Sequence, residues 1–104
     1  MAGTDRKTDG ELLERTKQET KKPDLYRVLL LNDDYTPMEF VVHLLESVYD
    51  KGPAEAYRIM MQVHTQGRGI CGVYPFDVAE TRVAATEQLA ETAGYPLKAV
   101  MEEE

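Results

Sequence analysis

Three adjacent polar residues, Asn32, Asp33 and Asp34, stand where an apolar run ends and a helical pattern begins. An amide and two carboxylates offer hydrogen-bond acceptors and negative charge, and they lie at the end of the next helix where the backbone dipole is positive. This combination suits a binding site. Turns before helices favour Asn and Asp for backbone reasons alone, so a purely structural role stays open for the three.

A second group of candidate residues recurs at helical spacing further along the chain. Met60, Val63 and His64 are three and four residues apart, which places them on one face of a helix. His64 can be a polar group at the rim of an apolar pocket, whose wall suits methionine because that side chain adapts its shape. It can equally be an ordinary histidine at the edge of the core. His43 has polar neighbours, and we expect it to face solvent.

The residues after the polar turn carry the signals of a helix start. Thr36 and Glu39 have the spacing of a capping box, in which the hydroxyl accepts from a first-turn N–H and the carboxylate reaches back. Pro37 falls at the first helical position, which tolerates proline well. Tyr35 and Phe40 occupy the two positions of a hydrophobic staple.

Apolar periodicity and turn residues predict an α+β domain of order β-α-α-β-α-β. Its three strands should form a mostly antiparallel sheet with the helices packed on it. The expected elements are a strand at Leu25–Leu31, a helix from Pro37 to about Tyr49, a helix from Pro53 to about Thr65, a strand at Arg68–Tyr74, a helix opened by Pro75 and stopped by Gly94, and a strand at Pro96–Met101.

Composition limits the classes of function that the chain can have. The 104 residues include 19 acidic and 12 basic ones, a formal net charge of −7, whereas a nucleic-acid-binding surface has to be basic. The single cysteine, Cys71, excludes an internal disulfide and leaves too little sulfur for a zinc cluster. No apolar run of spanning length and no leader pattern is evident, which predicts a cytoplasmic protein. Residues 1–23 predict a flexible tail, and residues 24–104 a single domain.

Four segments resemble the ClpS family, the adaptors of the ClpAP protease: Asn32–Val41, Met60–His64, Ile70–Tyr74 and Val78–Thr81. The likeness extends over nearly the whole domain, and its first segment is long and unusual. ClpS proteins bind substrates whose first residue is bulky and hydrophobic (N-degrons) and deliver them to the ClpA unfoldase. The resemblance therefore implies an adaptor for proteins with N-terminal Leu, Phe, Tyr or Trp and a free α-amino group.

The resemblance also implies roles for individual residues. Asn32, Asp33 and His64 hold the α-amino group. The pocket for the first side chain is formed or bordered by Asp34, Thr36, Met38, Val41, Met60, Val63 and Leu97. The contact to the N-terminal domain of ClpA falls on Asp77, Glu80 and Arg82, with arginine where lysine is usual. The tail at residues 1–23 is needed for delivery.

Two other classes of protein are alternatives to an adaptor. Asp33, Asp34 and His64 could be metal ligands or an acid–base set in a small enzyme, but no metal-ligand spacing and no activated nucleophile support this. We therefore expect no catalytic activity, no metal and no cofactor. A protein-interaction domain that does not read chain ends is the second alternative. Whether the chain is an adaptor or such an interaction domain, we expect a monomer that binds neither nucleic acid nor membrane.

Overall fold

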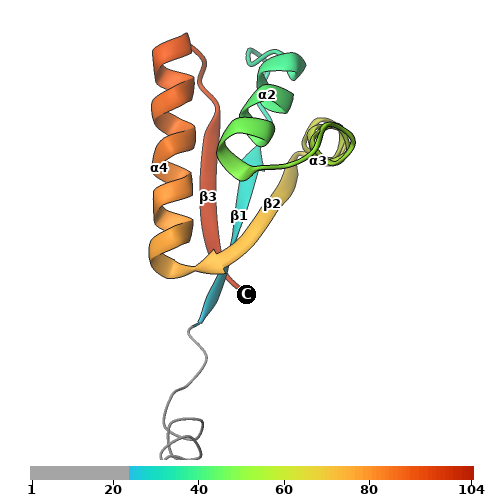
Figure 1. The fold of residues 1–104 in the computed structure, drawn as a ribbon. Helices are drawn as coiled ribbons and strands as arrows, with labels where there is room; N and C mark the ends of the chain where they lie inside the picture. The colour runs from blue at the N-terminus through green and yellow to red at the C-terminus, as the bar shows by residue number, and fades with distance from the viewer. Residues whose placement is uncertain (1–23) are drawn as a thin grey trace, which may run out of the picture.

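The computed structural model describes residues 24–104, so the predicted tail at residues 1–23 lies outside the described residues. In chain order the elements are β1 (Leu25–Leu31), α2 (Met38–Tyr49), α3 (Pro53–Gln66), β2 (Arg68–Pro75), α4 (Phe76–Ala93) and β3 (Lys98–Glu103) (Figure 1). The strands form one antiparallel sheet in the order β2-β1-β3. This arrangement confirms the predicted α+β fold.

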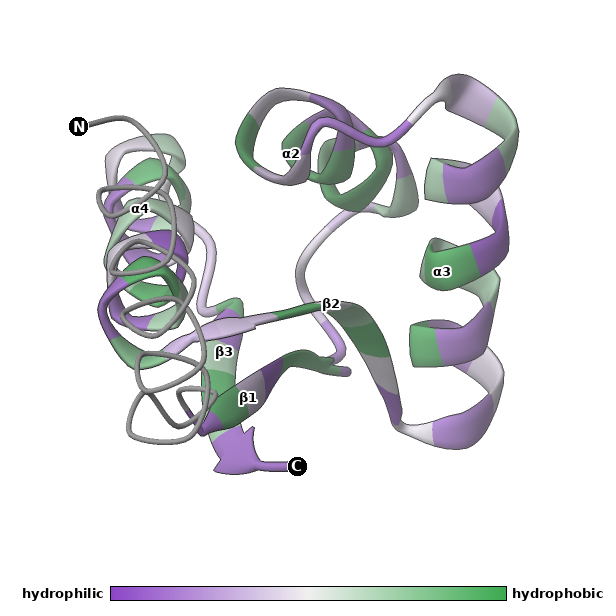
Figure 2. Ribbon diagram, turned by 60° about the horizontal axis from the view of Figure 1, so that its bottom comes forward, coloured by the Kyte–Doolittle hydropathy of each residue, from purple (hydrophilic) through white to green (hydrophobic). Residues whose placement is uncertain are grey.

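The core lies between the sheet and the three helices, which share one side of it (Figure 2). Val28 and Leu30 alternate along β1 and are fully buried, as are Leu44 and Leu45 on α2. Ile59 brings the inner face of α3 into the same cluster. Burial of each such side chain contributes about 1.5–3 kcal/mol, so these contacts fix where α2 and α3 lie over the sheet.

The last strand begins two residues later than predicted. β3 was expected at Pro96–Met101, and it occupies Lys98–Glu103. Pairing begins where Lys98 lies opposite Leu31, the last residue of β1, and proline has no N–H to give to the ladder. The partner strand, rather than the local apolar pattern, therefore sets the start of β3.

Two glycines bring the end of α3 close to β1 and β2. Gly67 ends α3 with a left-handed φ of 89°, as the sequence predicts. Its carbonyl accepts a hydrogen bond of 2.9 Å from the backbone N–H of Asn32, the first residue after β1. At Gly69 a Cβ would lie 2.7 Å from Cγ2 of Val63, so only glycine lets β2 approach α3 this closely. The polar turn after β1 is thereby tied to the helix that carries His64.

Candidate binding site

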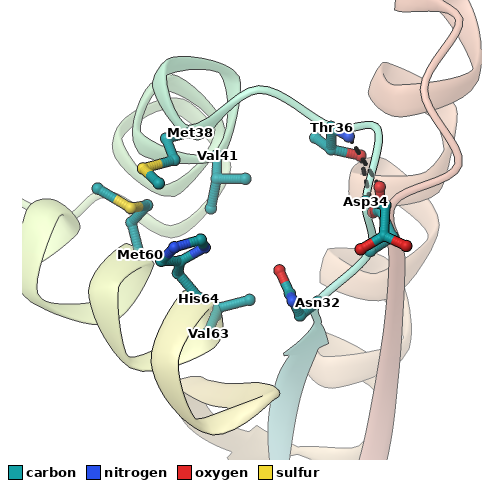
Figure 3. Close-up of a pocket in the computed structure, with 9 residues that line it drawn as sticks. Asn32, Asp34, Thr36, Met38, Val41, Met60, Val63 and His64 are labelled. Carbon is teal, nitrogen blue, oxygen red and sulfur yellow. Dashed lines mark hydrogen bonds between the residues drawn. The ribbon is translucent and has the colours of Figure 1, made fainter.

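A cavity of about 220 Å³ opens between the polar turn, α2 and α3 (Figure 3). The turn supplies one side, the start of α2 a second and the last two turns of α3 a third. The lining residues are Asn32, Asp33, Asp34, Thr36, Met38, Val41, Met60, Val63 and His64. All nine were candidate residues from the sequence, and the fold brings them to one place.

Leu97 is the one predicted pocket residue that does not line this cavity. It is buried, with 3% of its surface exposed, and it borders a separate hollow at the end of α4 with Glu87 and Glu91. It belongs to the same buried core cluster as the cavity residues Val41, Met60 and Val63. The nine residues that line the cavity supply its polar and apolar groups.

The carboxylate of Asp33 organises the turn. Its Oδ1 accepts the backbone N–H groups of Tyr35 at 2.8 Å and Thr36 at 2.7 Å, and its Oδ2 accepts the Thr36 hydroxyl at 2.8 Å. An aspartate whose side chain bonds the backbone two residues on is a recurrent turn former. The sequence left a structural role of this kind open for Asp33, but it did not predict the hydrogen bond from the Thr36 hydroxyl.

The predicted capping box is wrong. The Thr36 hydroxyl donates to Asp33, and no side chain caps α2. Pro37 is not the first helical residue but precedes the helix in an extended conformation, with φ −67° and ψ 146°, and its carbonyl accepts the N–H of Phe40 and of Val41. The carboxylate of Asp33 is an ionised acceptor, which makes it a stronger partner for the hydroxyl than a neutral group would be.

The predicted hydrophobic staple is also wrong. The Tyr35 side chain is 77% exposed, whereas the ring of Phe40 packs edge-on against Tyr95 with 4.9 Å between centroids. Tyr95 follows α4 in the chain, so a tertiary contact takes the place of the expected local one. Tyr35 is left at the surface beside the cavity, and its backbone N–H is the part that the turn uses.

Partial burial would by itself raise the pKa of Asp33. The hydrogen bonds from the Thr36 hydroxyl and from the backbone of Tyr35 and Thr36 outweigh this and lower the pKa below its ordinary value. Hydrogen bonds to a carboxylate favour its charged form. Asp33 is thus a stable anion at neutral pH, and with Asp34 beside it the turn end of the cavity is negative.

The opposite end of the cavity is apolar. Val41, Met60 and Val63 are each more than 90% buried, whereas Met38 at the start of α2 is 44% exposed. Figure 3 shows Met38 and Met60 reaching toward each other from α2 and α3, and His64 between them and Asn32. His64 is exposed, as is His43 on α2, which confirms the expectation that His43 faces solvent. The cavity therefore joins polar acceptors to a flexible apolar wall.

The predicted unfoldase-contact residues lie on α4, away from the cavity. Asp77 and Glu80 are exposed. The side chain of Arg82, by contrast, makes contacts within the domain. Its Nη1 donates to the Val48 carbonyl at 2.5 Å, and its guanidinium lies 5.5 Å from the Tyr74 ring centroid. A cation at the end of α2 also complements the helix dipole. Arg82 therefore links α4 to α2, a role that its sequence position did not reveal.

Metal and nucleophile chemistry find no support in the described part of the chain. No group of three or more His, Cys, Asp or Glu residues within residues 24–104 could hold a metal ion. Cys71 is buried, and this burial raises the pKa of its thiol to about 12. A protonated, inaccessible thiol is a poor nucleophile. Over the same residues, none of the helices has the length and apolar character needed to cross a bilayer.

Comparison with known proteins gives consistent matches. A sequence model of the family described as "ATP-dependent Clp protease adaptor protein ClpS" matches residues 21–100. The ATP-dependent Clp protease adapter protein ClpS of Hyphomonas neptunium is 54% identical over 104 residues, which is 100% of this chain and 88% of the relative. That of Parvibaculum lavamentivorans is 55% identical over 93 residues, 89% of this chain and 84% of the relative.

A solved structure is similar in both fold and sequence. It is that of Agrobacterium tumefaciens ClpS2 bound to L-phenylalaninamide. The TM-score is 0.78 at 41% sequence identity, and the match covers 80% of this chain and 100% of that one. The fold described above is thus similar to that of a relative of known structure.

Proposed function

The chain belongs to the ClpS family of ATP-dependent Clp protease adaptors, and from this we propose that its cavity binds the first residue of substrate proteins that carry an N-degron. The observation that carries the proposal is the cavity itself. Acceptors and negative charge line one end of it, and an apolar wall that includes two methionines lines the other. An N-terminal Leu, Phe, Tyr or Trp presents the same pair of features, an ammonium group beside a large apolar side chain.

In the proposed complex the α-amino group lies at the turn end of the cavity. An ammonium has three donors and a charge, so it needs acceptors and a negative field. Asn32 and His64 supply acceptor atoms. Asp33 supplies charge, and one of its lone-pair positions is still free beyond its three hydrogen bonds. Asp34 adds a second negative charge beside the same turn.

The first side chain then lies between α2 and α3. Its neighbours are Met38, Val41, Met60 and Val63, with Thr36 at the turn. Burial of such a side chain contributes about 1.5–3 kcal/mol, and each charge-assisted hydrogen bond about 1.5–3 kcal/mol. Association costs at least about 4 kcal/mol. The balance corresponds to micromolar or somewhat tighter binding, which lets a carrier release its cargo.

The ligand of the solved relative has the same chemistry. L-Phenylalaninamide carries a free α-amino group, an apolar aromatic side chain and an amide in place of the next peptide bond. It therefore stands in for the first residue of a polypeptide. The 41% identity and shared fold support placing a similar group in the cavity of this chain.

Delivery to a ClpA-type unfoldase is the second part of the proposal. The exposed face of α4 that carries Asp77 and Glu80 is the surface we assign to the N-terminal domain of the unfoldase. Arg82 contributes less of its charge to that surface, because its guanidinium is already bonded to Val48. The adaptor binds and hands over its substrate without chemistry of its own, so no metal or cofactor is required.

Peptide binding with matched N-termini tests the first part. Two labelled peptides that begin with Phe, one with a free amine and one acetylated, are titrated with the full chain by fluorescence anisotropy. We expect micromolar binding of the free peptide and at least about 30-fold weaker binding of the acetylated one, because at least about 2 kcal/mol of amine contacts is lost. Equal binding of the two would identify a protein-interaction domain that does not read chain ends.

A degradation assay tests the second part. Full chain and a variant lacking residues 1–20 are compared for peptide affinity and for degradation of a Phe-initiated reporter by ClpA and its protease. We expect affinities within about twofold, a difference of roughly 0.4 kcal/mol, but loss of degradation in the truncated protein. Full delivery without residues 1–20 would show that this segment is not needed.

A further inference from the structure

A second hollow adjoins the candidate site on the outer side of its methionine wall. It lies between α2 and α3, encloses about 360 Å³, and is lined by Met38, Glu39, Val42, Tyr57 and Met60. Met38 and Met60 line both cavities. The two cavities are thus neighbours that share a wall of two methionine side chains, the pair that Figure 3 shows between α2 and α3.

The second hollow is unusually apolar for an exposed surface of this acidic domain. Tyr57 is 58% exposed and Met38 44%, and the half-buried Val42 lines the hollow with them. Glu39, which the predicted capping box would have used, is instead exposed beside this patch. Exposed aromatic and methionine side chains gathered at the edge of a binding cavity are typical of a contact surface for a ligand.

We propose that this hollow is a second subsite, which takes the side chain of the third residue of the bound polypeptide. The inference rests on the proposed function of the first cavity. In an extended chain, side chains of residues one and three point to the same side and are about 6.8 Å apart. Atoms that pack on opposite sides of one methionine side chain are about 8 Å apart, since each contact spans about 4 Å. This distance is close to the separation of the first and third side chains, so the two can pack on opposite sides of the methionine wall. Residue two is only about 3.4 Å along the chain and points away.

The lining determines which third residues bind well. Met38, Val42 and Tyr57 favour a large aliphatic or aromatic side chain. The carboxylate of Glu39 repels Asp and Glu at this position. It tolerates Lys and Arg, whose apolar stems can lie on Tyr57 while the cation stays near Glu39. Selectivity for N-degrons in this chain therefore extends beyond the first residue.

The test uses peptides that all begin with Phe and carry a free amine, with Leu, Ala or Asp at position three and glycine at position two. A second set places the same residues at position two. With the full chain, we expect Leu at position three to bind about fivefold tighter than Ala, because an open hollow buries only part of the side chain. Asp should bind more weakly than Ala. The same substitutions at position two should change affinity by less than about twofold.

Two variants assign the effect to the hollow. Tyr57→Ala removes the largest exposed side chain of the hollow, and Tyr57 does not line the first cavity. The variant should bring the Leu-to-Ala ratio at position three to within about twofold, while the peptide with Ala keeps its affinity. Val78→Ala truncates another exposed apolar side chain, on α4, and should preserve the ratio. Equal affinities for all third residues in the wild type, or an effect confined to position two, would overturn the proposal. If the acetylated control peptide bound as well as the free one, the proposed function itself would be refuted.

Discussion

Replacing Asp33 by asparagine and by alanine would separate the two roles of its carboxylate. Asparagine has the same shape and can keep all three contacts of the turn. Its amide oxygen can accept the N–H groups of Tyr35 and Thr36, and its amide nitrogen can donate to the Thr36 hydroxyl, which reverses that hydrogen bond. Asp33→Asn therefore removes mainly the negative charge, whereas Asp33→Ala removes the charge and the three acceptor contacts.

The magnitudes follow from these contacts. A hydrogen bond to a charged group is worth about 1.5–3 kcal/mol and one between neutral groups about 1 kcal/mol, so Asp33→Asn should cost about 1 kcal/mol of peptide binding, or fivefold in Kd. Asp33→Ala should cost about 1 kcal/mol more, through disorder of the turn, and weaken binding about 30-fold in total. It should also lower the free energy of unfolding by about 1 kcal/mol, and Asp33→Asn should lower it by less, because the amide keeps the three contacts but loses the charge that strengthens them.

Titration of a labelled Phe-initiated peptide and urea unfolding of the same samples measure the two effects. Glu46→Gln is the matched control, because it removes one negative charge from α2 without lining either cavity. We expect its Kd within about twofold of the wild-type value. If Asp33→Asn binds as weakly as Asp33→Ala and lowers the free energy of unfolding as much, the assumption that the amide preserves the turn is wrong. Wild-type affinity in Asp33→Ala would remove Asp33 from the site.

The lowered pKa of Asp33 sets the pH range over which wild type and Asp33→Ala differ in the free energy of unfolding. A depressed folded-state pKa gives stability that is present above the ordinary carboxyl pKa, near about 3.9, and lost as pH falls through the lower value. The stability difference between wild type and Asp33→Ala should therefore be constant from about pH 5 to 8 and shrink below about pH 4. A difference that already declines near neutrality would contradict the assignment of the pKa shift to the turn.

Three further results are expected. Met38→Ala should let the cavity bind peptides that begin with Val or Ile, because the branched β-carbon of these residues would crowd Met38 at the mouth of the cavity. If the wild type already binds Ile as well as Leu in the same peptide titration, Met38 does not exclude β-branched residues. In urea unfolding, Gly69→Ala should lower the free energy of unfolding by about 1–3 kcal/mol, because it forces a Cβ against Val63. At Gly52 a Cβ would have no atom within 4 Å, so Gly52→Ala should leave the free energy of unfolding within about 0.5 kcal/mol of the wild-type value. Cys71, whose thiol pKa is raised to about 12, should resist iodoacetamide at about pH 8 until the chain is unfolded, and rapid alkylation of the folded protein would show that it is not buried.

Local sequence determined the elements of this protein and most of the candidate site. Strand β1 and the glycine that ends α3 follow from an apolar run and from the left-handed φ that glycine alone adopts without cost. Met60, Val63 and His64 could be placed together because helical spacing is a property of the chain itself. Asn32, Asp33 and Asp34 could be singled out by their residue types, whereas Thr36, Met38 and Val41 were named as pocket residues only through the resemblance to the ClpS family.

Only the tertiary structure decided which partner each polar or aromatic side chain chooses. Thr36 donates to Asp33 instead of capping α2, Phe40 packs on Tyr95 rather than on Tyr35, and Leu97 borders a separate hollow at the end of α4. These choices depend on groups that are distant in sequence or compete within one turn, and a sequence pattern does not rank them. The joining of two cavities across a methionine wall depends likewise on how α2 packs beside α3, because helix packing brings together side chains that no local spacing relates.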